Sequence, residues 1–351
     1  MLLKKIKYIL IALWQLIWLL FIMWVMFNAS LAVYLLRQAN GQFKIIYHTQ
    51  QVEDVLITSN ISLQQQNKIK LIQEVKAYAE VQFGLKKTDN YTTFYDQHNK
   101  PILWMLTACE PFSFNEKVWH FPLLGEVSYK GFFDYKLART EGIALKMQKY
   151  DVDIGKVSAW STLGFLPDPI LSSMLENEEG EIVELIIHEL THATLYFANN
   201  VDFNENFASF VGRQGALQFI KYKYGSESLE MKNYLLNVKQ ENTLKFFLLQ
   251  QKERLGAYYK TFAKDLSDRD KYLKKQQKMN EIIDALYLLE IYNWKTKIKI
   301  ANKIKLSGNA YFMSYNRYDG QYDKLLEIYK HQNSNLKAFI KYAAQNLNKV
   351  K

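Results

Sequence analysis

Two histidines stand four residues apart in the segment HELTH, which spans residues 188–192. Residues at this spacing lie on one face of an α-helix, so His188 and His192 can reach the same tetrahedral zinc ion if the segment is helical. A catalytic zinc site also needs a third protein ligand and an open position for water. The segment therefore predicts a helix with a second ligand-bearing element beside it.

The residues around HELTH favour this helix. Glutamates crowd its expected start, where carboxylates stabilise the positive end of the helix dipole. Ile182, Ile186 and Leu190 follow at steps of four residues and form an apolar face. His188 and His192 are left on the other face, so the ligand face is separate from the packing face.

Glu205 is the candidate third ligand. It follows a turn-prone stretch at residues 199–202, which gives the chain room to reverse and lay a second helix beside the first. Two histidines and one glutamate are typical of open, hydrolytic zinc sites, and Glu189 would then sit beside the remaining position. Ser209, one turn after Glu205, is predicted to orient a ligand through its hydroxyl.

Two explanations that involve no metal compete with the zinc site. A pattern with three fixed positions occurs by chance, and a histidine on a half-apolar helix is often an ordinary core residue. The placement of Glu189, the helical context and the acidic residue beyond a turn together favour zinc.

An apolar stretch without charge runs from Tyr8 to Phe27, long enough to cross a core of about 30 Å as a helix. It predicts a transmembrane helix within an N-terminal anchor, residues 1–36. Lysines precede the stretch, so we expect the N-terminus inside and the rest on the periplasmic or extracytoplasmic side of the inner membrane. A cleaved signal peptide, with small residues at 30–32, is the alternative, and it also exports the chain.

The remaining sequence predicts one α+β, helix-dominated domain over residues 37–351. The 351 residues are 49% hydrophobic, which is enough for a core, and a single cysteine excludes an intramolecular disulfide framework. Apolar spacing predicts a helix over 62–83, and short apolar runs broken by turn residues predict a small sheet between 91 and 164. After Pro169 the helical period returns, and no linker marks a further boundary.

The helices expected between Gly215 and Lys275 are rich in polar residues. They could cover the site as a lid or form a solvated hairpin, and the sequence leaves both interpretations open.

Longer blocks extend the pattern beyond HELTH. Together with Tyr196 and the segment FNENFASFV at 203–211, the motif resembles the bacterial family of predicted zinc aminopeptidases within the gluzincin-type metallopeptidases. The resemblance runs from about Gly41 to the end of the chain. Further segments similar to blocks of that family are WHFPLLG at 119–125, YKGFFD at 129–134 and SAWSTLGF at 158–165, continuing to Asp168-Pro169.

The resemblance implies a zincin-like fold with a small sheet before the HExxH helix. It also implies a Zn²⁺ ion on His188, His192 and Glu205, with Glu189 as the general base of peptide hydrolysis. An edge strand beside the cleft would bind an extended peptide by main-chain hydrogen bonds. The residues expected in that strand are Ser158, Trp160, Ser161, Thr162 and Gly164.

A developing oxyanion usually needs a donor besides the metal. Tyr318 is predicted to be this catalytic donor, and it follows the segment Asn309-Ala310, which resembles a further family block. Tyr196, Tyr315 and His331 are alternatives.

An aminopeptidase must also pair the free ammonium of its substrate with a carboxylate. Glu110 and Asp168 are candidates, and spacing singles out neither. The exopeptidase character therefore rests on the resemblance, because an endopeptidase of the same mechanism would show the same residues.

We therefore expect a membrane-tethered zinc peptidase, an aminopeptidase by resemblance, that takes a peptide substrate and contacts the lipid bilayer through residues 8–27. The alternative is a non-hydrolytic envelope scaffold or binding protein that retains a zincin fold, but such a protein would not need Glu189. The net charge of +10 does not predict nucleic-acid binding, because export disfavours it. The sequence indicates neither the cleavage position nor the oligomeric state.

Overall fold

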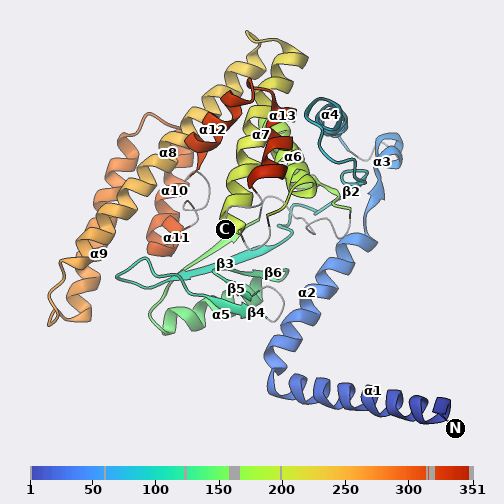
Figure 1. Ribbon diagram of the computed structural model, residues 1–351. Coiled ribbons are helices and arrows are strands. Elements are labelled where there is room, and N and C mark those ends of the chain that lie inside the picture. Colours follow the sequence, from blue (N-terminus) through green and yellow to red (C-terminus); the bar gives the residue numbers. More distant parts are fainter. Residues whose placement is uncertain are drawn as a thin grey trace. The chain divides into compact units, whose positions relative to one another are not determined.

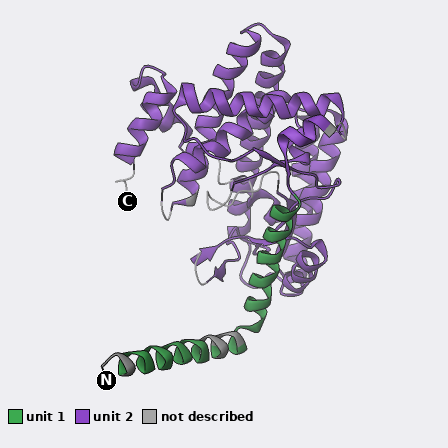
Figure 2. Cartoon of the chain, turned by 90° about the vertical axis from the view of Figure 1, so that its right-hand side faces the viewer, with its two compact units in different colours: residues 1–48 green, residues 49–351 purple. Residues whose placement is uncertain are grey.

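The computed structural model divides the chain into two compact units, residues 1–48 and 49–351 (Figures 1 and 2). The structure describes residues 2–58, 61–121, 125–157, 167–197, 200–313, 315 and 321–347. Within these, the side chains at 2–4, 21, 22, 24, 25, 58 and 201 are not described. The sequence analysis placed a boundary between residues 36 and 37, at the start of the α+β domain, and this boundary stays a prediction.

The first unit consists of two helices, α1 (Leu2–Phe27) and α2 (Ala29–Tyr47). The predicted membrane anchor is wrong. A span needs about 20 consecutive, mainly apolar residues in one helix, and in the described part of the chain no helix is long and apolar enough to cross a membrane. The single-pass topology, the inner-membrane location and the bilayer contact of residues 8–27 depended on that helix, so they are corrected with it.

The second unit contains a three-stranded antiparallel sheet. Its central strand, β3 (Trp104–Cys109), pairs with β6 (Lys130–Phe132) on one side and with β7 (Asp151–Lys156) on the other. Helix α5 (Tyr135–Met147) connects β6 to β7 and packs against β3 and β7. The β3–β7 register runs from Trp104 opposite Lys156 to Cys109 opposite Asp151. This confirms the small sheet predicted before the HELTH helix.

Shorter strands complete the β structure. β1 (Gln50–Gln51), β2 (Thr93–Tyr95) and β8 (Ile170–Leu171) form a second sheet, in which β2 and β8 are parallel. β4 (Trp119–Phe121) and β5 (Gly125–Val127) form an antiparallel pair. Helix α3 (Val52–Thr58) follows β1 directly, and a 3₁₀ turn at Ser172–Glu176 leads from β8 to the HELTH helix.

Three helices form the core around the motif: α4 (Leu63–Tyr78), α6 (Glu179–Thr194) and α7 (Val201–Tyr224). α4 begins with a capping box between Ser62 and Gln65 and continues into a π-helical turn at Ala79–Phe83. Its apolar stripe is completely buried, and α6 packs against both α4 and α7. The helix predicted over 62–83 is therefore confirmed.

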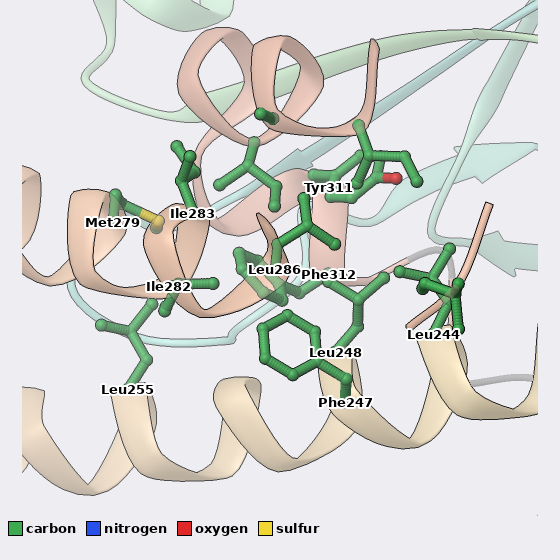
Figure 3. Packing of buried hydrophobic residues seen from close by; sticks show 14 of the residues in the cluster. Leu244, Phe247, Leu248, Leu255, Met279, Ile282, Ile283, Leu286, Tyr311 and Phe312 are labelled. Carbon is green, nitrogen blue, oxygen red and sulfur yellow. The ribbon is translucent and has the colours of Figure 1, made fainter. Parts of the chain in front are cut away.

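The C-terminal half is helical. Its elements are α8 (Leu229–Lys260), α9 (Asp268–Leu288), α10 (Trp294–Ser307), α11 (Asn309–Met313), α12 (Tyr322–His331) and α13 (Leu336–Asn346). Figure 3 shows side chains of α8, α9 and α11 gathered in one buried cluster, with Leu248, Leu286 and Phe312 among them. The polar helices α8 and α9 thus bury one face in this hydrophobic cluster. The helix-dominated α+β class is confirmed, whereas the zincin-like fold stays a prediction.

Candidate metal centre

The HELTH segment lies on helix α6, whose start is capped and whose apolar side is buried. The backbone N–H of Glu178 donates to Glu181 Oε2 at 3.3 Å, which closes a capping box at the helix start. Ile182, Ile186 and Leu190 are fully buried on the apolar side. Because this side is fixed in the core, the opposite side presents the histidines in one orientation.

The three predicted ligands converge. His188 Nε2 and His192 Nε2 lie 3.1 Å apart. Glu205, on α7, places one carboxylate oxygen 3.6 Å from His188 Nε2 and the other 3.5 Å from His192 Nε2. Helix α6 therefore supplies two nitrogen donors, and α7 supplies the oxygen donors that face them.

These separations fit a zinc ion. Ligand atoms about 2.1 Å from a tetrahedral zinc lie about 3.4 Å from one another. The two imidazole nitrogens lie 3.1 Å apart, and each faces a different oxygen of Glu205, at 3.6 and 3.5 Å, so each separation is close to this value. Two imidazoles and one carboxylate also form the donor set of open, hydrolytic zinc sites. The geometry and the donor chemistry are thus both suited to zinc.

Ser209 lies on the other side of the His188 ring. Its Oγ is 3.4 Å from His188 Nδ1, one helical turn after Glu205 on α7. A polar partner at Nδ1 favours the orientation in which Nε2 faces Glu205 and His192. The role predicted for Ser209 stays a prediction.

Glu189 is half-buried beside the three donors. Burial raises the pKa of its carboxyl to about 7, helped by the negative charges of Glu205 and Asp168 and opposed by His188. The pKa of His192 is lowered to about 4 by burial and by the neighbouring His188. A carboxyl that titrates near neutrality is suited to accept and return a proton.

Gly212 allows α7 to approach α6 closely. A Cβ at this position would lie 2.9 Å from the backbone oxygen of Glu184 and 3.2 Å from His188 Cβ. Only glycine fits this crossing without a shift of the helices. Since Glu205 and Ser209 lie earlier on α7, the close approach also sets their distance from the histidines.

Substitution of Gly212 by Ala is expected to destabilise the protein. Overpacking costs about 1–3 kcal/mol, which exceeds the gain of about 1 kcal/mol from replacing glycine within a helix. The matched control is Gly256→Ala on α8, where the added Cβ would lie at an ordinary 3.4 Å from Phe114. Denaturant unfolding should show a lower free energy of unfolding for the first variant and an equal or higher one for the second. Equal changes in both would contradict the close-packing argument.

Several predicted residues lie outside the described part of the chain. These are the predicted donor Tyr318 and the predicted peptide-binding residues Ser158, Trp160, Ser161, Thr162 and Gly164. Their roles stay predictions.

The alternative oxyanion donors occupy different positions. Tyr196 is 46% exposed. His331 is exposed at the end of α12. Tyr315 lines a cavity that Ser209 also lines. Of these three residues, only Tyr315 shares a cavity with Ser209, a residue of the candidate metal centre.

The two carboxylates considered for the substrate ammonium also differ. Asp168 is 2% exposed, and its backbone N–H donates to Asn90 Oδ1 at 3.1 Å. Glu110 is exposed and accepts hydrogen bonds from Ser113 Oγ at 2.7 Å and from Asn115 Nδ2 at 3.0 Å. Asp168 is enclosed in the core, and Glu110 is engaged within its own loop.

Glu184 and Arg213 were not predicted from the sequence. Arg213 Nε donates to Glu184 Oε1 at 3.3 Å, and the Tyr234 hydroxyl donates to the other oxygen of Glu184. Glu184 stands four residues before His188, so helical spacing could have found it. Tyr234 lies on α8 and carries no such local signal.

One comparison identifies a family. A family model described as "Putative aminopeptidase" matches residues 33–351 of the chain. No curated protein and no solved structure matches it. The predicted resemblance to an aminopeptidase family is thereby confirmed. The gluzincin assignment and a bacterial origin stay predictions.

Proposed function

The chain belongs to the putative aminopeptidase family, and on that premise we propose that it is a zinc-dependent peptidase that removes residues from the amino end of peptides. Membership in this family supports peptidase activity. The zinc dependence, the mechanism and the exopeptidase character are the finer parts of the proposal.

The observation that carries the proposal is the convergence of His188, His192 and Glu205 beside Glu189. The pairwise separations of 3.1–3.6 Å suit one ion. A purely structural site would need the ligands but not a further carboxylate beside them. This carboxylate favours a hydrolase over a scaffold that only binds zinc.

A zinc ion held there would supply Lewis-acid chemistry, polarising a carbonyl and making a water molecule more acidic. The chain's own residues would do the rest. The Glu189 carboxylate would accept a proton from the attacking water and deliver it to the leaving amine. Ser209 would keep the His188 ring in its orientation through Nδ1.

Metal removal tests the function directly. The purified full-length chain, loaded with zinc, is expected to cleave short peptides, and a chelator should abolish the cleavage until zinc is restored. Free and N-acetylated forms of each peptide should be compared by mass analysis of the products. Zinc binding without any cleavage would favour the scaffold instead. Cleavage that persists in chelator would contradict the metal-dependent mechanism.

A further inference from the structure

Helices α6 and α7 face each other with two stripes of polar residues. Each stripe repeats every four residues, so its members lie on one side of their helix. The stripes consist of Glu184, His188 and His192 on α6 and of Glu205, Ser209 and Arg213 on α7. The candidate ligands occupy one end of the two stripes, so the charged residues at the other end need an explanation of their own.

The two stripes meet in three steps. Glu205 faces both histidine nitrogens, at 3.6 and 3.5 Å. One turn further along α7, Ser209 Oγ lies 3.4 Å from His188 Nδ1. After another turn, Arg213 Nε donates to Glu184 Oε1 at 3.3 Å. Later residues of α6 thus face earlier residues of α7, so the helices run in opposite directions. Arg213 follows Glu205 by eight residues, about 12 Å along the helix.

Helix α8 holds both members of the Glu184–Arg213 pair. The Tyr234 hydroxyl donates to the other carboxylate oxygen of Glu184, and Arg213 Nη1 donates to Asn242 Oδ1 at 3.0 Å. Tyr234 packs directly on α6, because a Cβ at Gly180 would lie 2.7 Å from its ring. The side chains of Glu184 and Arg213 are 21% and 18% exposed. Salt screens such a pair only weakly, and loss of one charge leaves the other without its main partner.

This ion pair can fix what the close approach at Gly212 leaves free. The contact of Gly212 with the backbone of Glu184 sets the separation of the two helices at one point, but either helix could still rotate or slide about that point. The hydrogen bond from Arg213 Nε is directional, so it restricts both movements. A shift of α7 along α6 would move the Glu205 carboxylate away from the histidine nitrogens. Donors that are held in place before zinc binds lose less conformational freedom on binding.

We propose that Glu184 and Arg213 are positioning residues of the metal centre. Their ion pair holds α7 in register with α6 and thereby keeps the Glu205 carboxylate opposite the two histidines. Neither side chain belongs to the three that converge, so both act through their helices. This inference rests on the zinc site of the proposed function and not on the peptidase reaction.

A role in folding stability alone is the competing explanation, and a second ion pair of the chain provides a matched control. Lys130 Nζ donates to Glu141 Oε2 at 2.7 Å between β6 and α5, and the two side chains are 17% and 28% exposed. Glu141 also accepts a hydrogen bond from Trp119 Nε1 at 3.1 Å, as Glu184 does from a tyrosine hydroxyl. Loss of either pair should cost stability, whereas only loss of the pair between α6 and α7 should alter zinc binding.

Zinc affinity of the full-length chain, measured by competition with a chromophoric chelator, provides the first test. Arg213→Gln and Glu184→Gln should each lower the affinity by about 10-fold, the lower end of the effect of residues that hydrogen-bond a ligand directly. The double variant should bind zinc no more weakly than the weaker single variant, because either change breaks the pair. Arg213→Lys keeps the charge but not the planar fork, so it should recover part of the loss. Lys130→Gln should bind zinc like the unaltered chain, even where its unfolding midpoint falls.

The visible absorption of bound Co²⁺ provides a second readout, which a role in stability alone would not change. The number and geometry of the ligands determine this spectrum. At saturating Co²⁺, and below the unfolding midpoint of each variant, the spectra of Arg213→Gln and Glu184→Gln should differ from that of the unaltered chain. The spectrum of Lys130→Gln should not differ. If one of the two pair variants does not fold, the other provides the comparison, and Arg213→Lys provides it if neither folds.

The inference and the proposed function fail in different ways. If the unaltered chain binds no zinc at the three ligands, both are wrong. If zinc binds but no peptide is cleaved, the peptidase function is wrong, and the positioning role is still decided by the affinities and the spectra. If the pair variants and Lys130→Gln share the same affinity and spectrum, the positioning role is overturned and the function stands. Effects of Arg213→Gln and Glu184→Gln that multiply in the double variant would also overturn it, because the two residues would then act independently.

Discussion

Glu189→Gln is expected to lower peptide turnover by about 10²- to 10⁴-fold while one zinc ion stays bound per chain. The amide has nearly the shape of the carboxylate but cannot accept the water proton. The carboxylate can accept a proton from water and return it to the leaving amine, and the amide loses this ability. The change should fall on kcat, because Glu189 is not among the converging ligand atoms.

Metal content and unfolding serve as internal controls for this variant. Zinc per chain and the thermal unfolding midpoint should both stay close to those of the unaltered chain. Unchanged turnover would show that Glu189 is not the base. Loss of zinc together with turnover would show that it acts on the metal site itself.

Glu205→Ala is expected to weaken zinc binding by more than about 100-fold. Removing a residue that hydrogen-bonds to a metal ligand lowers metal affinity by about 10- to 100-fold. Removing a ligand itself should lower the affinity further. Glu205 is also the only carboxylate that faces both histidine nitrogens, at 3.6 and 3.5 Å, in the described part of the metal centre. Competition with a chromophoric chelator measures the affinity.

Ser209→Ala is the matched comparison on the same helix. Its hydroxyl lies 3.4 Å from His188 Nδ1 and does not face the ion position. Zinc affinity should therefore fall less than in Glu205→Ala. A reversed order, or unchanged affinity in Glu205→Ala, would contradict the assigned ligand set.

The convergence of the three candidate ligands could be predicted largely because most of the information for it is local. The spacing of His188 and His192 and the apolar face at Ile182 and Ile186 both depend only on the helical period. Glu205 required one tertiary assumption, a reversal of the chain before α7. The close approach of α7 to α6 at Gly212 explains the short distance between Glu205 and the two histidines. The sequence pattern did not reveal this close approach.

The cavity could not be predicted in the same way. Part of the wall of the cavity beside Ser209 and Tyr315 comes from α8, a long polar helix whose sequence leaves its inward face undecided. That face is fixed by packing of Leu248 against residues such as Leu286 and Phe312, which come from distant parts of the chain (Figure 3). The register of β3 with β7, which places Leu106 opposite Ile154, is likewise a long-range property.

The membrane anchor failed for a different reason. Its prediction rested on the length and apolar composition of residues 8–27 and on the lysines before them. The helix over 62–83 and the sheet were predicted instead from the spacing of apolar residues and from turn residues.

Diffraction from crystals of the zinc-loaded full chain, recorded at the zinc absorption edge, tests the central claim most directly. The account predicts one anomalous peak about 2.0–2.1 Å from the Nε2 atoms of His188 and His192 and about 2.0–2.2 Å from a Glu205 oxygen. A peak elsewhere, or a Glu205 carboxylate beyond bonding distance with no other ligand in its place, would contradict it.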